Sequence, residues 1–246
     1  MKIRHQATGR CNSDTTITYL TYYIRPDIIR LDFNGRSANS SMIYQPSSKK
    51  IWVVYHHEKR FYSMDEDDMS MYDQKVRGAA SEYEFKRNQM SEEEKERSPD
   101  VFSGSNPLLA ENEVYTYRKH MDSLVSQLMC RRYDARLSDG RLKKVYLNNF
   151  KSMKIDDASL SILQEFHDFM GVGSQVMAGS LDFTAFRKWD QGGYPVLVET
   201  WSASMLCNTL WMTSISREKK KDDFFKVPYS FSRIDNASGR SPESQD

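Results

Sequence analysis

Short runs of β-branched and aromatic residues, each about the length of a strand, fill the first quarter of the chain. The breaks between them hold turn residues, such as Pro26-Asp27 and Asn34-Gly35. Connections this short exclude parallel pairing, because a parallel crossover needs about a dozen residues or more. The pattern therefore predicts an antiparallel meander with strands at Thr15–Ile24, Ile28–Phe33, Ser41–Gln45, Ile51–His57 and Arg60–Met64.

The spacing of apolar residues changes at Asp65. Beyond it they recur at intervals of about 3.6 residues, which predicts an amphipathic helix from about Asp67 to Arg97. The acidic residues at 65–68 suit the positive end of a helix dipole. Gly78 is a point at which this helix could break or kink.

The second half of the chain repeats the pattern of strands followed by a helix. Asp139-Gly140 is a strong hairpin signal between two alternating runs. Asp156 or Asp157 is expected to cap a helix that ends near Gly171 and Gly173. The remaining predicted elements are strands at 113–119, 126–137, 142–147, 195–205 and 210–217, and a short helix at about 181–189.

These elements predict an α+β fold in which a curved antiparallel sheet, a half-open β-barrel, wraps round the long helix. One or two further short helices complete it. We expect residues 1–13 to be an N-terminal tail, 14–232 to form a single domain, and 233–246 to be a disordered polar tail.

Composition and charge exclude several classes of protein. The formal net charge of +1 gives no basic surface for nucleic acid. The mean hydropathy of -0.71 and the lack of a run of about 20 apolar residues argue against a membrane-spanning chain. The N-terminus has no secretory signal as written, which fits a cytosolic protein and equally a mature or recloned chain.

The three cysteines allow two interpretations. Cys11, Cys130 and Cys207 form neither a disulfide framework nor a metal-ligand cluster. One pair could bridge in an oxidising compartment. The alternative, which we favour from the sequence, is three buried or unpaired thiols.

No motif in the sequence predicts catalysis, a metal or a cofactor. His56 and His57 are neighbours on a strand, so their side chains point to opposite faces and cannot jointly hold one ion. The chain lacks a zinc-protease motif, a phosphate-binding loop and a nucleophile elbow. The four acids at 65–68 are better explained as a solvated helix start.

The aromatic and methionine side chains are the positive signal. One interpretation is an ordinary packed core; the other is that some of them line an apolar cavity, a role that suits the adaptable thioether of methionine. The cavity interpretation assigns ligand binding to Tyr19, Met42, Trp52, Val54, Phe61, Met64, Tyr72, Val76, Trp201, Met205 and Trp211.

Several short motifs follow one another in a set order along 14–229. They are Ile29-Arg30-Leu31-Asp32, Ile51-Trp52-Val53-Val54, Phe61–Met64, Cys130–Tyr133, Asp139-Gly140, Val145-Tyr146-Leu147, Gly193-Tyr194-Pro195-Val196 and Phe225-Lys226-Val227-Pro228. Together they resemble bacterial envelope proteins with a lipoprotein-carrier (LolA-like) fold. The resemblance is closest to a branch described as a domain of unknown function.

This resemblance implies a non-enzymatic protein of the periplasm or cell envelope that binds an acyl chain or a lipidated protein in an apolar cavity. The missing signal sequence and the aromatic bulk of 182–193 depart from the family. An alternative is a structural or interaction protein whose cavity is filled by its own side chains and holds no small-molecule ligand. A third hypothesis is an enzyme whose site is assembled from scattered residues.

Overall fold

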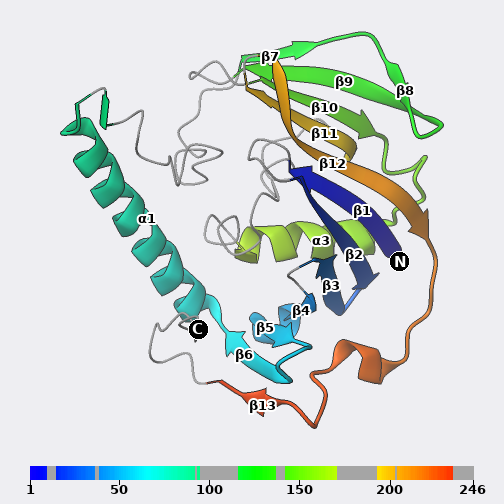
Figure 1. The fold of residues 1–246 in the computed structure, drawn as a ribbon. Helices are drawn as coiled ribbons and strands as arrows, with labels where there is room; N and C mark the ends of the chain where they lie inside the picture. The colour runs from blue at the N-terminus through cyan, green and yellow to red at the C-terminus, as the bar shows by residue number, and fades with distance from the viewer. Residues whose placement is uncertain are drawn as a thin grey trace.

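The computed structural model describes residues 1–9, 15–36, 39–91, 93–94, 116–136, 142–170, 193–202 and 204–234. Within these ranges the chain is an α+β protein built on one large, strongly curved sheet (Figure 1). The sheet is antiparallel throughout, except where its last strand pairs in parallel with β6 (Arg60–Met64). Its two edges do not meet, so the predicted half-open barrel is confirmed.

The strand order shows how the two halves of the chain join. It runs β13-β6-β5-β4-β3-β2-β1-β12-β11-β10-β9-β7, and β8 pairs with β9 alone. The strands are β1 (Lys2–Gly9), β2 (Thr16–Arg25), β3 (Ile28–Gly35), β4 (Asn39–Gln45), β5 (Lys50–Tyr55), β6 (Arg60–Met64), β7 (Thr116–Lys119), β8 (Ser123–Val125), β9 (Leu128–Arg136), β10 (Leu142–Asn148), β11 (Tyr194–Ser202), β12 (Met205–Ser216) and β13 (Ser232–Arg233).

The N-terminal residues differ from the expected tail. Lys2–Gly9 form β1, which lies in the middle of the sheet between β2 and β12. Ile3, His5 and Ala7 point to the buried face, while Arg4 and Gln6 lie on the other. The prediction of a tail is wrong because a histidine occupies one of the inward positions and masks the alternation.

The predicted meander is confirmed as β2 to β6, with bounds that differ by only a few residues. In the second half, the strand predicted at 126–137 is confirmed as β9, except that its first two residues, Ser126 and Gln127, form the turn that joins β9 to β8. The turn predicted at Asp139-Gly140, the stop at Gly171 and Gly173, and the helix at 181–189 lie outside the described residues.

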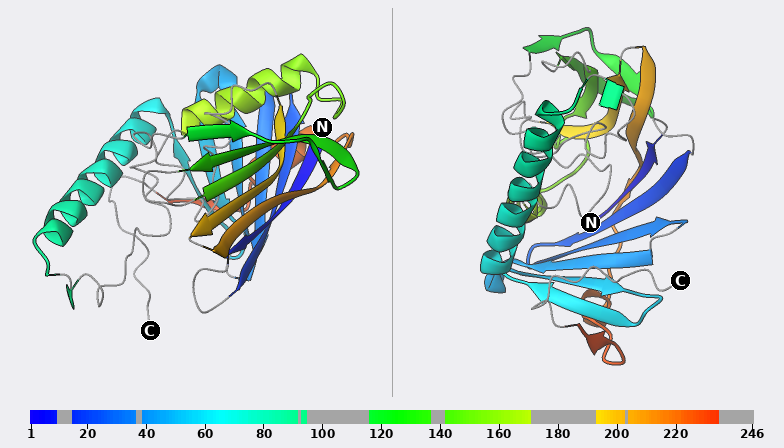
Figure 2. Two further views of the ribbon diagram at one scale, coloured as in Figure 1. Left: turned by 90° about the horizontal axis from the view of Figure 1, so that it is seen from above. Right: turned by 60° about the vertical axis from the view of Figure 1, so that its left-hand side comes forward.

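The long helix α1 (Glu66–Asn88) begins directly after β6 and stands on the open side of the curved sheet (Figures 1 and 2). A reciprocal pair of bonds caps it: the Asp68 amide donates to Asp65, and the Asp65 amide donates to Asp68. It runs through Gly78 without a break and ends before the expected Arg97.

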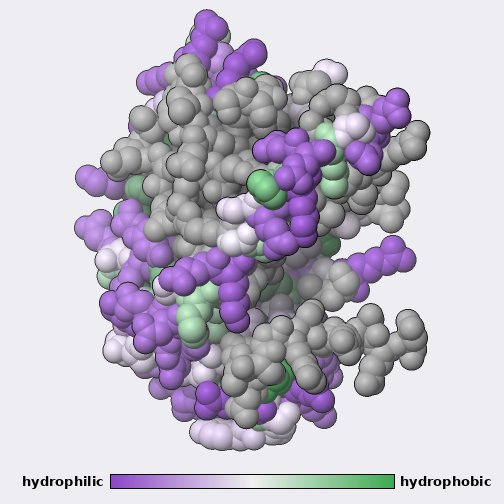
Figure 3. Space-filling view, turned by 90° about the vertical axis from the view of Figure 1, so that its left-hand side faces the viewer, coloured by the Kyte–Doolittle hydropathy of each residue, from purple (hydrophilic) through white to green (hydrophobic). Residues whose placement is uncertain are grey.

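The described surface of α1 is mostly exposed. Met69 is buried near its start, but Met71 and Phe85 are exposed. From the side on which α1 lies, the described surface is mainly hydrophilic (Figure 3). Among the described side chains of α1, Met69 is the buried one, and the helix lies at the open side of the half-open barrel (Figure 1).

The helix in the hollow of the sheet is the shorter α3 (Asp157–Met170) (Figure 1). Asp156 caps it by accepting a bond from the Ser159 amide at 2.8 Å, as the sequence predicted. Its apolar side packs mainly against β2 and β3, which defines the concave face of the sheet. The buried residues on that side are Ile162, Leu163, Phe166 and Met170.

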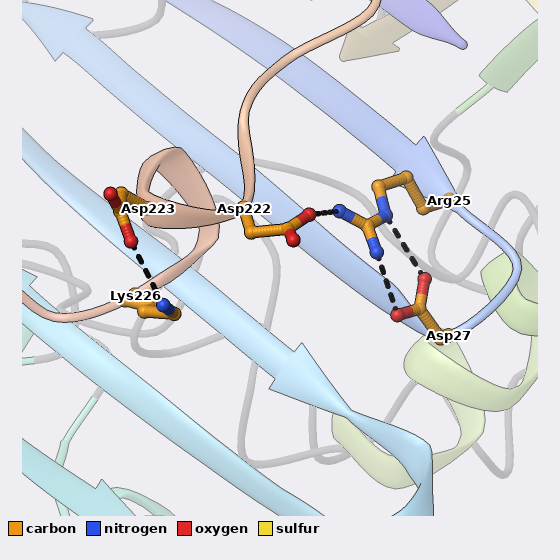
Figure 4. Close-up of polar contacts among 5 residues, drawn as sticks. All are labelled: Arg25, Asp27, Asp222, Asp223 and Lys226. Carbon is orange, nitrogen blue, oxygen red and sulfur yellow. Dashed lines mark hydrogen bonds and ion pairs between the residues drawn. The ribbon is translucent and has the colours of Figure 1, made fainter.

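Residues 217–234, here called the C-terminal strap, cross the opposite, convex face of the first half. The strap contains a short 3-10 helix, η2 (Asp222–Phe225), and ends in β13 beside β6 (Figure 1). Arg25 binds Asp222 of the strap and also Asp27 on its own turn (Figure 4). Lys2 binds Glu218 at 2.5 Å.

Candidate functional site

The concave face under α3 is a packed core. Phe166 of α3 lies against Tyr44 of β4, with ring centroids 5.7 Å apart, and Phe169 lies 5.0 Å from the same ring. The Tyr44 hydroxyl donates to Glu165 at 3.0 Å, which gives the buried phenol a partner at the rim. Burial and this carboxylate raise the pKa of Tyr44.

The described side chains beneath α3 pack closely against one another. Leu31, Met42, Tyr44, Leu163 and Phe166 are each at most 4% exposed. A void large enough for water would leave accessible surface on the side chains that line it. Among the described residues, these five side chains therefore leave no water-sized void between them.

Two histidines and two tyrosines form a buried cluster where α3 meets the centre of the sheet. His5 of β1 stacks on Tyr194 of β11 and meets the edge of Tyr22 of β2, each at a centroid distance of 5.8 Å. His167 of α3 lies 6.1 Å from Tyr22. His5 Nε2 and the Tyr194 hydroxyl are 3.2 Å apart, within hydrogen-bond distance.

Burial sets the charge of this cluster. It lowers the pKa of His5 to about 3 and that of His167 to about 3, the latter also through repulsion from His5. Burial also raises the pKa of Tyr22 and Tyr194. All four groups are therefore neutral at pH 7.

A second apolar cluster lies on the concave face of the other half of the sheet. Tyr133, Val145 and Val198 occupy one register row of β9, β10 and β11, and Leu210 of β12 continues it. α3 packs mainly on β2 and β3, so this cluster lies beyond its main contact.

A serine, a histidine and an aspartate meet on the convex face. Ser41 Oγ lies 2.6 Å from Asp32 Oδ1 and 2.6 Å from His56 Nε2. Arg30 donates to Asp32 at 2.6 Å, to Ser41 at 2.9 Å and to the carbonyl of Phe224 in the strap at 2.6 Å. The Arg30 guanidinium also lies over the Phe224 ring at 4.3 Å.

The direction of these hydrogen bonds does not activate the serine. An ionised aspartate only accepts, so Ser41 gives its single proton to Asp32, and His56 Nε2 and Arg30 donate to Ser41. A nucleophilic serine instead needs the histidine to accept its proton. Burial, with repulsion from Arg30, also lowers the pKa of His56. The arrangement is a structural network that holds the strap.

Three of the residues predicted to bind a ligand are buried. Met42 and Met64 belong to the core on the concave side, and Val54 points to the convex side. Trp52 and Phe61 share that convex side and are half-buried.

The other predicted residues lie elsewhere. Tyr19 and Trp211 are 52% and 44% exposed on the convex face, Met205 is exposed, and Trp201 is half-buried. Tyr72 and Val76 lie in α1, but their side chains are outside the described part. The described members are thus spread over both faces of the sheet, and their binding role stays a prediction.

The cysteines differ from the favoured interpretation. Cys207 is disulfide-bonded, so the prediction of three unpaired thiols is wrong for this residue. Cys130 is a free thiol buried in the core, where desolvation raises its pKa. Cys11 lies outside the described residues.

The described residues hold no group of three or more histidine, cysteine or carboxylate side chains placed to hold a metal ion. Within the same ranges, neither α1 nor α3 combines the length and apolar character that crossing a bilayer requires.

The buried histidine cluster and the Arg30 network were both missed from the sequence. His5 and His167 are far apart in the chain, and only pairing of β1 with β2 and packing of α3 brings them together. The alternation of Ile3, His5 and Ala7 was the available signal for His5. Arg30 and Asp32 are two residues apart on one strand, so they share a face, which was the signal for the network.

Comparison with known proteins gives likenesses of shape only. No protein-family model matches the sequence, so the predicted branch of unknown function finds no support, and no curated protein matches it either. An uncharacterised conserved protein from Thermus thermophilus is 6% identical, with a TM-score of 0.45, over 95% of this chain and 90% of that one.

Two further solved structures cover most of the chain. MucB, in its complex with MucA from Pseudomonas aeruginosa, is 10% identical with a TM-score of 0.39, over 94% of this chain but 57% of that one. A putative outer membrane lipoprotein-sorting protein domain from Vibrio parahaemolyticus is 9% identical with a TM-score of 0.28, over 91% and 87%. Because these TM-scores are below 0.5, the neighbours assign neither a family nor a function.

Proposed function

We propose that this chain is a non-enzymatic interaction protein of the cell envelope that binds partners through its outer surface. The observation that carries the proposal is the filled interior under α3. Leu163 and Phe166 of the helix and Leu31 and Tyr44 of the sheet leave no accessible surface of consequence between them. A carrier of acyl chains needs an apolar cavity of a few hundred Å³ at least.

The Cys207 disulfide supports an extracytoplasmic location. Disulfides form and persist in oxidising compartments and are rare in the cytosol. The expected periplasmic or envelope location, which came from the family resemblance, therefore gains an independent argument from this chain.

The Ser41 network supports a non-enzymatic role. Its serine lies within hydrogen-bond distance of both the aspartate and the histidine. Because His56 donates to Ser41, the trio lacks a base for the serine proton.

Native mass spectrometry of protein purified from cells without detergent tests the proposal against the carrier hypothesis. We expect the mass of the bare chain, because the interior is closed by α3. A chain that carries a stoichiometric lipid adduct would overturn the proposal in favour of acyl-chain binding. Protein stripped with organic solvent and refolded provides the reference mass.

A further inference from the structure

One register row on the convex face alternates amide and aromatic side chains over the centre of the sheet. Successive pairings place Asn34 of β3 beside Tyr19 of β2, Tyr19 beside Gln6 of β1, and Gln6 beside Trp211 of β12. We call Asn34, Tyr19, Gln6 and Trp211 the aromatic–amide row. It is extended by Asn39 of β4 at one end and Leu197 of β11 at the other.

The row is open to solvent. Tyr19 is 52% and Trp211 44% exposed, Asn34 is exposed, and Gln6 between the two rings is half-buried. Neighbouring strands lie about 4.8 Å apart, so the two rings are separated by roughly 10 Å across Gln6. Large aromatic side chains exposed side by side on a sheet mark a binding surface more often than isolated ones do.

The Trp211 indole is held in place before any partner arrives. Its Nε1 donates to the Ser126 hydroxyl at 2.6 Å. Ser126 and Gln127 form the β8–β9 turn with φ of 49° and 65°, a left-handed pair that fixes the direction of the hairpin over β12. A ring that is already fixed loses little conformational entropy on binding.

The four residues of the aromatic–amide row carry no formal charge, whereas the rows on both sides do; the register reaches a charged residue, Arg132, only beyond Leu197 and Tyr146. Arg4 lies in the row on one side, and Glu199 with Lys144 lies in the row on the other. Nucleic acid and anionic membranes need several lysines or arginines to neutralise phosphate. A neutral row bordered by charges therefore favours an uncharged partner.

Ring faces and amides together define the chemistry of that partner. An aromatic face packs against C–H groups, and the amides of Gln6 and Asn34 donate to and accept from hydroxyl groups. A pyranose offers both, with C–H groups on its faces and hydroxyls at its edge. In an extended β-linked glycan these units repeat with a step comparable to the spacing of strands.

We propose that the aromatic–amide row binds an uncharged, extended β-linked glycan, with sugar rings on Tyr19 and Trp211 and hydroxyls on Gln6 and Asn34. This deepens the proposed function, on which it rests, by naming the partner of the outer surface. The residues of the aromatic–amide row lie on the convex face, so a binding measurement at this row does not depend on what the concave face holds.

Isothermal titration calorimetry with cellohexaose and with chitohexaose tests the assignment and distinguishes two sources of the same chemistry. We expect the full chain to bind at least one of them, and W211A and Y19A each to weaken binding by about tenfold. W211F and Y19F keep a ring at each position and should stay within about threefold of the parent chain.

Phe85→Ala is the matched control, because Phe85 is an exposed aromatic on α1, away from the row. It should bind as the parent chain does. Thermal melting checks that each variant folds, and Y19A carries the test if W211A melts early. No heat with either glycan, or unchanged binding by a folded W211A and Y19A, would overturn the assignment.

A protein captured through Tyr19 and Trp211 with no glycan bound would overturn it as well. The failure of this assignment is distinguishable from failure of the proposed function. A lipid adduct in native mass spectrometry would refute the closed interior, but W211A would still bind the glycan more weakly than the parent chain. Conversely, a titration without glycan binding would refute this assignment and leave the mass of the bare chain unchanged.

Discussion

The two halves of the sheet are covered differently. On β2–β6, α3 packs on the concave face and the strap crosses the convex one, so Ile43 and Val54 are buried although they point away from α3. On the other half, Trp211 of β12 and Leu124 of the β8–β9 hairpin are exposed. A strand that is apolar on both faces signals two covering layers, whereas alternation signals one.

This contrast separates the parts that hold the fold from the part that is free to bind. The doubly covered half contains Phe166, Tyr44 and the Arg30 network, all of which join segments distant in sequence. The aromatic–amide row lies on the part of the convex face that the strap leaves open: Gln6 and Trp211 belong to β1 and β12, and Tyr19 and Asn34 to exposed positions of β2 and β3. Substitutions in the doubly covered half should therefore lower the free energy of unfolding, whereas substitutions in the aromatic–amide row should mainly change binding.

The largest expected effect is in the core under α3. F166A removes a fully buried ring from its place against Tyr44 and should lower the free energy of unfolding by about 3–5 kcal/mol, the loss typical of buried aromatic truncation. Urea denaturation followed by circular dichroism measures it. F85A on α1 should change the same quantity by less than about 0.5 kcal/mol. Equal effects would show that α3 is not the central packing element.

Releasing the strap should have the next largest effect. R30A removes the bonds to Asp32, Ser41 and the Phe224 carbonyl and leaves Asp32 without its ion-pair partner, at a cost of about 3 kcal/mol. Hydrogen exchange should speed up at the Ser232 and Ile234 amides, which bond to the β5–β6 hairpin. R36A, at an exposed arginine, is the control. If both amides still exchanged slowly in R30A, Arg30 would not be what holds the strap.

Acid should weaken the central cluster. The pKa of His5 is about 3 in the folded protein and near 6.5 when unfolded, so the unfolded state binds the proton between these values. The stability is present above pH 6.5 and falls as the pH drops towards 3, by about 2 kcal/mol for His5 at pH 5.

The pH dependence of H5Q measures this contribution. Its free energy of unfolding should fall less steeply between pH 7.5 and pH 5 than that of the parent chain, because glutamine does not titrate. H57Q, at an exposed histidine of the β5–β6 turn, should keep the parent profile. Parallel profiles for H5Q and the parent would show that His5 is not buried in its neutral form.

The smallest expected effect is at the exposed ion pairs of Arg25, one of which joins it to Asp222 of the C-terminal strap. R25A removes the ion pairs to Asp27 and Asp222, which are open to solvent, and should cost less than about 1 kcal/mol (Figure 4). The effect should shrink further in high salt. A loss as large as that of R30A would place the main attachment of the strap at Arg25.

Local signals explain what was predictable from the sequence. The hairpins of β2–β6 follow from turn residues such as Asn34-Gly35, and α3 follows from its Asp156 cap, because each depends on a few neighbouring residues. The pairing of β1 with β12 depends on residues at opposite ends of the chain, and no local pattern encodes it.

The candidate site was harder to predict for the same reason. Tyr19 and Tyr22 are both aromatic residues on β2, yet one is exposed on the convex face and the other is buried beneath α3. Ligand binding was predicted at Tyr19 but not at Tyr22, and only the sheet register shows which face each side chain occupies. The strap, which crosses the face on which Val54 lies, is also far from Val54 in sequence.

The place of β1 has a consequence for how the molecule assembles. Its neighbours are β2, which follows it directly in the sequence, and β12, which is synthesised only after all the other strands of the main sheet except β13. Such non-local pairing is slow to form because a very large loop must close first. We thus expect the meander and the later hairpins to form separately. The pairing of β1 with β12, which joins them, is then the last step of folding.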